Sequence, residues 1–229
     1  MSSTPRTSAT SAFEPAGQAK TPPRTKQERR DQAEQSLVEA ASRLVARRGV
    51  DQTSVADVGT EAGYSRGLVN HHFGSKVALL QRVARESQRS LVDVVEALTG
   101  DPLESLVVLI RSYLTWIDRN PAEARAFFAL WGAALPEESV LREVFAEFDS
   151  RIRTQIEEYV RAGQEHGIIR IDVEPAGVAA AITGMLRGTG AQLLVAPGQI
   201  DFEAACTACE QFVRRALTVP GPSSPRVRD

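Results

Sequence analysis

Residues 53–80 read TSVADVGTEAGYSRGLVNHHFGSKVALL and contain start and stop signals for two short helices. Ser54 follows Thr53 and stands three residues before Asp57, an arrangement typical of a capping box that starts a short helix. Gly63 ends that helix, and Ser65 can cap another over about 65–72. Two short helices joined by a few residues around a glycine have the proportions of a helix-turn-helix.

The second of these short helices carries side chains that suit contact with DNA. In a helix-turn-helix unit this helix lies in the major groove. Arg66 can reach a base edge, with guanine as the best geometric match, and Gly67 removes a side chain where the helix approaches DNA closely. Polar side chains nearby can bind phosphates, which position a protein without specifying a sequence. The expected DNA interface comprises Thr53, Ser65, Arg66, Gly67, Leu68, Asn70, His71, His72 and Lys76.

The segment ahead of this unit is basic, although the chain as a whole has a net charge of −2. Residues 20–48 contain eight basic and four acidic residues. Residues 1–25 are rich in Ser, Thr, Pro and Ala and are predicted to be a disordered basic arm, suited to minor-groove or backbone contact. An isolated run of this kind is more often a solvated tail, but its place beside a helix-turn-helix favours contact with DNA.

The remaining chain is helical in pattern almost throughout. Apolar residues step at three and four, and prolines or glycines stand at the breaks. Residues 168–173, IIRIDV, are too few and too isolated to form a sheet. About nine helices predict an all-α protein with a DNA-binding domain over 26–88, a second helical domain over 89–219 and a disordered tail over 220–229. The expected helices span about 37–48, 54–62, 65–72, 75–98, 102–119, 121–135, 137–166, 175–196 and 201–218.

Composition and cysteine usage indicate a cytoplasmic protein with no membrane segment. The chain has 42% hydrophobic residues and two cysteines, too few for a disulfide framework. The N-terminus lacks the apolar core of an export signal, and no apolar run approaches the roughly 20 residues that span a bilayer.

Two pairs of residues could indicate an enzyme, but for each pair the sequence favours a structural role over a catalytic one. Adjacent residues on a helix diverge by about 100°, so His71 and His72 cannot share one metal ion. Cys206 and Cys209 could form a redox pair, but no strand precedes them, and burial as small apolar residues is favoured. We therefore expect no catalytic site, no metal and no cofactor.

The stretch from Thr53 to Leu80 resembles the DNA-binding signature of TetR-type one-component transcriptional regulators. Within it, the segment GLVNHHFGSK is most similar in sequence to the BetI-like branch of that family. That signature has Thr opening the helix, Ala-Gly-x-Ser at the turn, and Phe-x-Ser-Lys after the recognition helix. Two positions depart from it. Asn70 stands where the family usually has a tyrosine that contacts phosphate, and Gly59 replaces the usual alanine, which costs of order 1 kcal/mol of helix propensity.

The resemblance implies a small-molecule effector that binds within the second domain. Aromatic residues concentrate in its middle helices, and helical bundles can hold ligand cavities, although such a stripe is most often core. The ARAFFALWGAAL stretch (124–135) mixes bulky rings with small residues, which leaves room for a ligand. The expected pocket residues are Trp116, Phe127, Phe128, Trp131 and Met185, with Arg111 or Arg125 as a polar anchor.

The resemblance also implies a homodimer formed through the two C-terminal helices. Their many small residues allow close helix packing, between chains or within one. A two-fold symmetric dimer would bind a palindromic double-stranded DNA operator. It would act as a repressor that leaves the operator when a small, largely apolar ligand binds to the protein. The alternatives are a ligand-independent DNA-binding protein and, from another class, a helical metal or redox enzyme.

Overall fold

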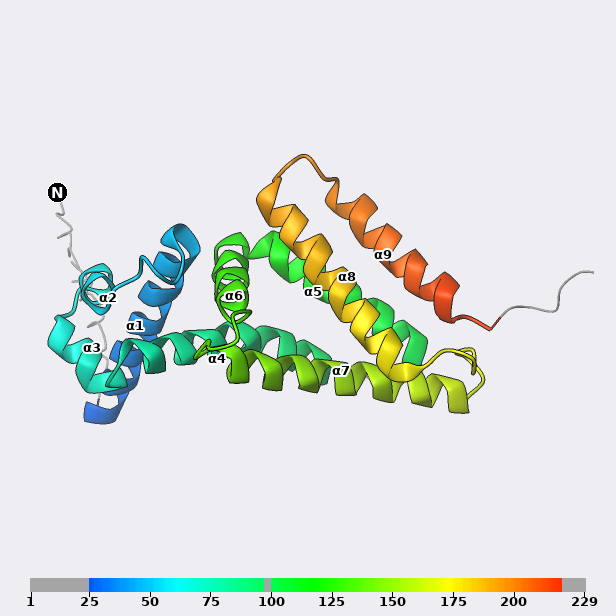
Figure 1. Cartoon of the computed structure of the whole chain (residues 1–229), viewed down its shortest axis with the longest axis horizontal. Helices are drawn as coiled ribbons and strands as arrows, with labels where there is room; N and C mark the ends of the chain where they lie inside the picture. The colour runs from blue at the N-terminus through cyan, green and yellow to red at the C-terminus, as the bar shows by residue number, and fades with distance from the viewer. Residues whose placement is uncertain (1–24, 97–99, 220–229) are drawn as a thin grey trace, which may run out of the picture.

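The computed structural model describes residues 25–96 and 100–219, which form nine α-helices and confirm the all-α prediction (Figure 1). Residues 1–24 of the predicted basic arm (1–25) and the tail over 220–229 lie outside the described residues, and Thr25 caps α1. The helices are α1 (Lys26–Arg48), α2 (Val55–Ala62), α3 (Arg66–Phe73), α4 (Lys76–Glu96), α5 (Pro102–Arg119), α6 (Pro121–Ala133), α7 (Arg142–Glu165), α8 (Pro175–Val195) and α9 (Phe202–Leu217).

Two helix starts differ from the sequence prediction. Helix α1 begins at Lys26, because Thr25 and Glu28 form a capping box ahead of two polar turns that lack the apolar pattern. Helix α7 begins at Arg142 rather than at 137. The hydroxyl of Ser139 donates to the Ala133 carbonyl at 2.6 Å, and this hydrogen bond holds residues 136–141 as a turn.

The helices form two packed groups, one that contains α2 and α3 and one that contains α5, α7, α8 and α9. Helices α1, α4 and α6 connect the two groups. Helices α1–α3 lie at one end of the molecule in Figure 1, and α8 and α9 extend toward the other. Helix α1 packs against α2, α4 and α6, while α5 lies at the centre of the second group against α7, α8 and α9. One buried apolar core runs through both groups. The unit formed by α1–α3 is therefore held directly against the remaining helices.

The 168–173 stretch pairs at one point only. Ile169 forms an isolated antiparallel bridge with Thr218, and the Arg170 amide donates to the Leu217 carbonyl at 2.9 Å. No strand forms within the described residues. The bridge ties the end of α9 to the segment that leads into α8.

Helix α8 departs from the expectation that no apolar run in the chain approaches the length needed to span a bilayer. By length and composition only, it is long and apolar enough to cross a membrane. It nevertheless packs along α7 and α5, and its Arg187 is buried in an ion pair with Asp149 of α7. One such helix is weak evidence for a membrane segment, and these contacts are those of a bundle helix.

Truncation at the centre of α5 should be costly. Leu114 is fully buried, so Leu114→Ala should lower the free energy of unfolding by about 2–5 kcal/mol. Val108 on the same helix is 47% exposed, and Val108→Ala should change it by less than about 0.5 kcal/mol. Urea unfolding at one fixed protein concentration checks both, and equal effects would contradict the described core.

Candidate nucleic-acid interface and effector region

The turn between α2 and α3 depends on two glycines. Gly63 ends α2 with φ of 75°, a left-handed conformation that glycine adopts without strain. At Gly59 a Cβ atom would lie only 2.9 Å from the Tyr64 carbonyl oxygen. Glycine at 59 therefore lets the turn pack directly on α2, a reason for its presence that helix propensity alone does not reveal.

Helix α3 has one buried and one exposed face. Val69 is buried, and Leu68, His72 and Phe73 are half-buried against the other helices. The exposed positions Arg66, Gly67, Asn70 and His71 are three and four residues apart, so they lie on one side of the helix. Ser65 is exposed at the N-cap, where its hydroxyl accepts from the Leu68 amide at 3.2 Å. The described geometry thus offers most of the predicted residues to a partner on a single surface.

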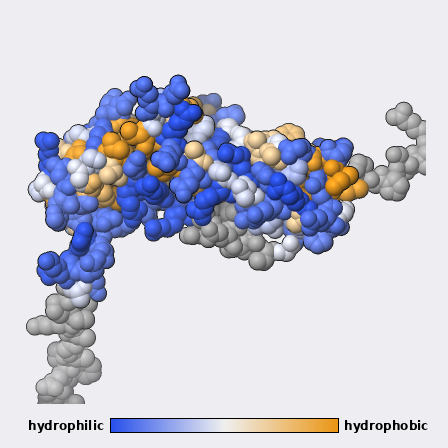
Figure 2. Space-filling model, turned by 60° about the horizontal axis from the view of Figure 1, so that its bottom comes forward, coloured by the Kyte–Doolittle hydropathy of each residue, from blue (hydrophilic) through white to orange (hydrophobic). Residues whose placement is uncertain are grey.

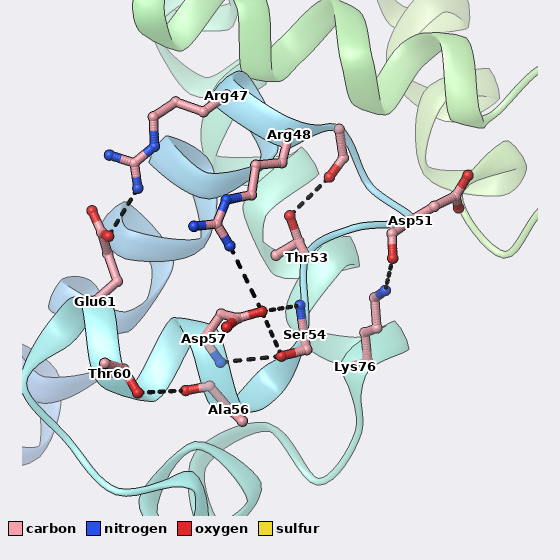
Figure 3. A network of polar contacts seen from close by, with 11 residues as sticks. Arg47, Arg48, Asp51, Thr53, Ser54, Ala56, Asp57, Thr60, Glu61 and Lys76 are labelled. Carbon is pink, nitrogen blue, oxygen red and sulfur yellow. Dashed lines mark hydrogen bonds and ion pairs between the residues drawn. The ribbon is translucent and has the colours of Figure 1, made fainter.

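Besides Ser65, two more of the predicted residues have hydrogen-bond partners within the protein (Figure 3). Thr53 is only 2% exposed, and its hydroxyl donates to the Gly49 carbonyl at 2.8 Å. It therefore fixes the loop between α1 and α2, where Ser54 is the helix cap. Lys76 is half-buried, and its Nζ donates to the Asp51 carbonyl at 3.4 Å.

Arginines at the end of α1 hold α2 in place (Figure 3). Arg47 lies 2.8 Å from Glu61, and Arg43 lies 3.3 Å from the same carboxylate. Hydrogen bonds from Arg47 and Arg43 lower the pKa of Glu61. Asp57 accepts hydrogen bonds from Ser54, and these lower its pKa as well. Part of the predicted basic surface is therefore engaged in fixing the recognition unit.

Four of the residues predicted for the effector pocket lie together among α5 and α6. The rings of Trp116 and Phe127 are 6.2 Å apart, Phe127 and Phe128 are 5.5 Å apart, and Phe128 and Trp131 are 6.5 Å apart. The edge-to-face geometry of these pairs is typical of a packed aromatic cluster. Other rings that join it are Tyr113, Phe145 and Phe148.

A charged residue at the centre of this aromatic cluster was missed in the sequence. The guanidinium carbon of Arg187 on α8 lies 4.3 Å from the ring centre of Phe127, 5.6 Å from Trp131 and 5.7 Å from Phe148. Its Nη2 donates to Asp149 at 2.6 Å. Arg187 is the only charged residue of α8, and this was the signal available in the sequence. The cluster is thus built around a cation and its carboxylate partner.

The other three predicted pocket residues lie elsewhere. Arg111 pairs with Glu210 at 2.5 Å and with Glu203 at 3.0 Å, which ties α5 to α9. Arg125 is exposed and reaches only backbone carbonyls, and Met185 lines a surface groove between α8 and α9. In the aromatic cluster itself, the Trp116 Nε1 is buried without a hydrogen-bond partner.

The cysteine pair has the surroundings of structural residues. Cys206 and Cys209 are both free and buried on α9. Burial raises the pKa of the Cys206 thiol to about 11, so the reactive thiolate is scarce at neutral pH. These surroundings suit packing rather than redox exchange.

The matches to known protein families extend over both helical groups. Residues 37–83 match the model described as bacterial regulatory proteins, tetR family, and residues 102–218 match BetI-type transcriptional repressor, C-terminal. The chain is 25% identical over 188 residues to the HTH-type transcriptional regulator BetI of Vibrio campbellii (80% of this chain, 90% of the relative). It is 27% identical over 188 residues to BetI of Vibrio vulnificus (80% and 91%).

A solved structure shows the same fold. A regulator from Saccharomonospora viridis, crystallised in complex with choline, superposes with a TM-score of 0.73 at 23% identity, over 83% of this chain and 100% of that one. The family consists of DNA-binding regulators and not of enzymes, as the sequence predicted. The chain belongs to the TetR family of bacterial transcriptional regulators and carries a BetI-type repressor domain.

Proposed function

We propose that this repressor binds a palindromic operator in the cytoplasm as a homodimer and releases it when a small effector binds the C-terminal helices. The observation that carries the proposal is the exposed face of α3, on which Arg66, Gly67, Asn70 and His71 stand together. Arg66 is exposed in the first turn of that helix, where a recognition helix contacts base edges.

The contacts to DNA divide into two kinds. Arg66 is proposed to read a base, because a guanidinium can donate two hydrogen bonds to guanine. Ser65, Asn70, His71, His72 and Lys76 are proposed to bind phosphates, with Leu68 helping to seat the helix. We assign Thr53 to positioning, because its hydroxyl is already bonded inside the protein.

The proposed dimer face lies on α8 and α9. Phe212 of α9 is 63% exposed, and beside it runs an apolar groove lined by Val178, Ala181, Met185 and Ala216. Figure 2 shows apolar surface next to the C-terminal trace, at the end of the molecule where α9 ends. Exposed apolar patches of this kind mark association surfaces. A two-fold pair would present both recognition helices to one palindrome.

The proposed effector region is the part of the C-terminal helices around the aromatic cluster. The Saccharomonospora relative holds choline, and aromatic rings bind cations of that type well. In this chain Arg187 already lies over the Phe127 ring, so a choline-like cation would have to displace it. A largely apolar effector, as the sequence suggested, would likewise meet the Arg187–Asp149 pair.

Effector binding is proposed to change the separation of the two recognition helices. Such coupling requires the effector to bind one conformation more tightly than the other. Helix α4 is the element suited to transmit the change, because it follows α3 directly and packs against α1, α6 and α7.

Arg66→Ala should remove base reading. We expect wild-type protein to bind DNA from immediately upstream of its own gene at near-physiological salt with excess random competitor. Loss of one base contact costs about 1–3 kcal/mol per recognition helix, so Arg66→Ala should lose its preference over random DNA. Fluorescence anisotropy measures both proteins. Wild-type binding that the competitor abolishes on every candidate site from a genome-wide selection would contradict the proposal and favour a non-specific binder.

Thr53 and Lys76 should differ in the salt dependence of DNA binding. Lys76→Ala should reduce the slope of log K against log salt by about 0.9 for each phosphate that the lysine neutralises. Thr53→Val should leave the slope unchanged while lowering the free energy of unfolding by about 1–2 kcal/mol, because the Gly49 carbonyl loses its donor. Salt titrations and urea unfolding test the pair. A reduced slope in Thr53→Val would show that Thr53 contacts phosphate after all.

Phe212→Glu should weaken the dimer without unfolding the chain. The side chain is exposed in the single chain, so charge there opposes association and leaves the core intact. Sedimentation equilibrium should show a shift toward monomer, and operator affinity should fall with it. Gln211→Glu, at the neighbouring exposed position, adds the same charge and is the control. An unchanged dimer in Phe212→Glu would place the interface elsewhere.

A further inference from the structure

A cavity separate from the groove between α8 and α9 lies between α4 and α7, close to the aromatic cluster. Its described lining consists mostly of charged and polar residues. Its volume is about 250 Å³. Figure 2 turns the underside of Figure 1 toward the reader, and much of the middle of that face is hydrophilic. The described residues that carry the argument are Arg85, Gln88 and Arg89 from α4, and Glu147, Phe148 and Arg151 from α7.

The charge of this lining favours an anion. The described lining includes Arg85, Arg89 and Arg151 with the single carboxylate of Glu147, and Arg151 already has an interaction of its own. Arg89 is only loosely engaged, with its Nη1 3.4 Å from Glu86. Arginine binds carboxylate and phosphate oxygens in paired hydrogen bonds, which makes it the preferred residue for such groups.

A buried donor in the same lining is unsatisfied. Gln88 is only 6% exposed, yet its Nε2 has no hydrogen-bond partner. Leaving a buried amide N–H unpaired is costly, so a group of this kind calls for an explanation. An acceptor oxygen of a bound ligand supplies one once the Gln88 side chain turns its buried Nε2 toward the cavity, and this observation is independent of the charge argument.

We propose that this cavity, the α4–α7 pocket, binds a small organic anion with carboxylate or phosphate oxygens, and that this anion is an effector. Arg85, Arg89 and the Gln88 amide take the oxygens, and the ring of Phe148 takes an apolar portion. The effector role rests on the proposed function, whereas the binding site does not.

The α4–α7 pocket is connected to the DNA-binding helices through side-chain contacts. Arg89 of the pocket pairs with Glu86, and Glu86 pairs with Arg82 at 2.6 Å. Arg82 also lies 3.4 Å from Glu34 on α1. An anion that draws Arg89 away from Glu86 leaves Arg82 as the main partner of that carboxylate, which weakens the link from Arg82 to α1.

The pocket also touches the aromatic cluster. The Phe148 ring lines the pocket and lies 5.7 Å from the Arg187 guanidinium carbon and 6.1 Å from the Phe127 ring. A ligand that moves Phe148 therefore changes the packing around the buried ion pair. The anion bound in the α4–α7 pocket would therefore act both through the Arg89–Glu86–Arg82 ion pairs and through the Phe148 ring.

Binding is tested on the full-length protein with benzoate and inorganic phosphate as probes and choline chloride as the cationic comparison, all at matched ionic strength. Isothermal titration and thermal unfolding are measured for wild type, Arg85→Gln, Gln88→Met and Arg153→Gln. Arg153 lies on α7 outside the pocket lining, so its variant removes the same charge as Arg85→Gln without touching the site.

We expect at least one anion to bind wild type and Arg153→Gln, and both pocket variants to bind it at least tenfold more weakly. Gln88→Met should be as stable as wild type without anion, because it removes an unpaired donor. No anion binding to wild type, or equal binding to all four proteins, overturns the proposal. Stabilisation by choline alone overturns the assigned ligand class.

Operator titrations in the absence of anion separate this inference from the proposed function. Operator binding without anion binding would sink the pocket and leave the regulator intact. Anion binding that disappears in Gln88→Met, with no operator binding by any of the proteins, would keep the site and remove its effector role. Release of the operator by the anion in wild type, but not in Gln88→Met, is the expected result.

Discussion

Helix α1 packs its apolar side against both the recognition unit and the helices of the second group. Its buried side, which includes Leu37, Val38, Ala41, Leu44 and Val45, faces α2, α4 and α6. The helix that supports the recognition unit is therefore also part of the core of the second group. Because a close-packed interface resists small deformations, a change around α4 or α6 cannot leave α1 untouched. The shared helix is the physical basis for the coupling between DNA and effector that we propose.

The elements that sequence reasoning located well are those fixed by neighbouring residues. Ser54 with Asp57, and Ser65 with the Leu68 amide, set the starts of α2 and α3 within three residues of chain. Glycine at 63 ends α2 for an equally local reason. The DNA-binding half could therefore be predicted closely. The early start of α1 was also encoded locally, by Thr25 and Glu28, but it lay outside the apolar pattern used to find the helix.

The features that escaped prediction depend on side-chain contacts outside the local helix pattern, with hydrogen bonds that span six and 38 positions of the chain. The turn before α7 is held by Ser139 reaching back to Ala133. Arg187 finds its carboxylate partner 38 positions earlier, and periodicity along α8 contains nothing that names it. The aromatic residues could be recognised as a group, but only the packing of α5, α6, α7 and α8 shows that a guanidinium lies among them.

Helix α9 is fixed along its length before any second chain arrives. Near its start and middle, Arg111 of α5 pairs with Glu203 and Glu210, and near its end Arg214 pairs with Glu104. The Leu217 carbonyl accepts from the Arg170 amide at its last turn. A surface already rigid in the single chain loses little conformational entropy on association. In the proposed homodimer, each subunit therefore contributes an α9 surface that contacts within its own chain already hold in place.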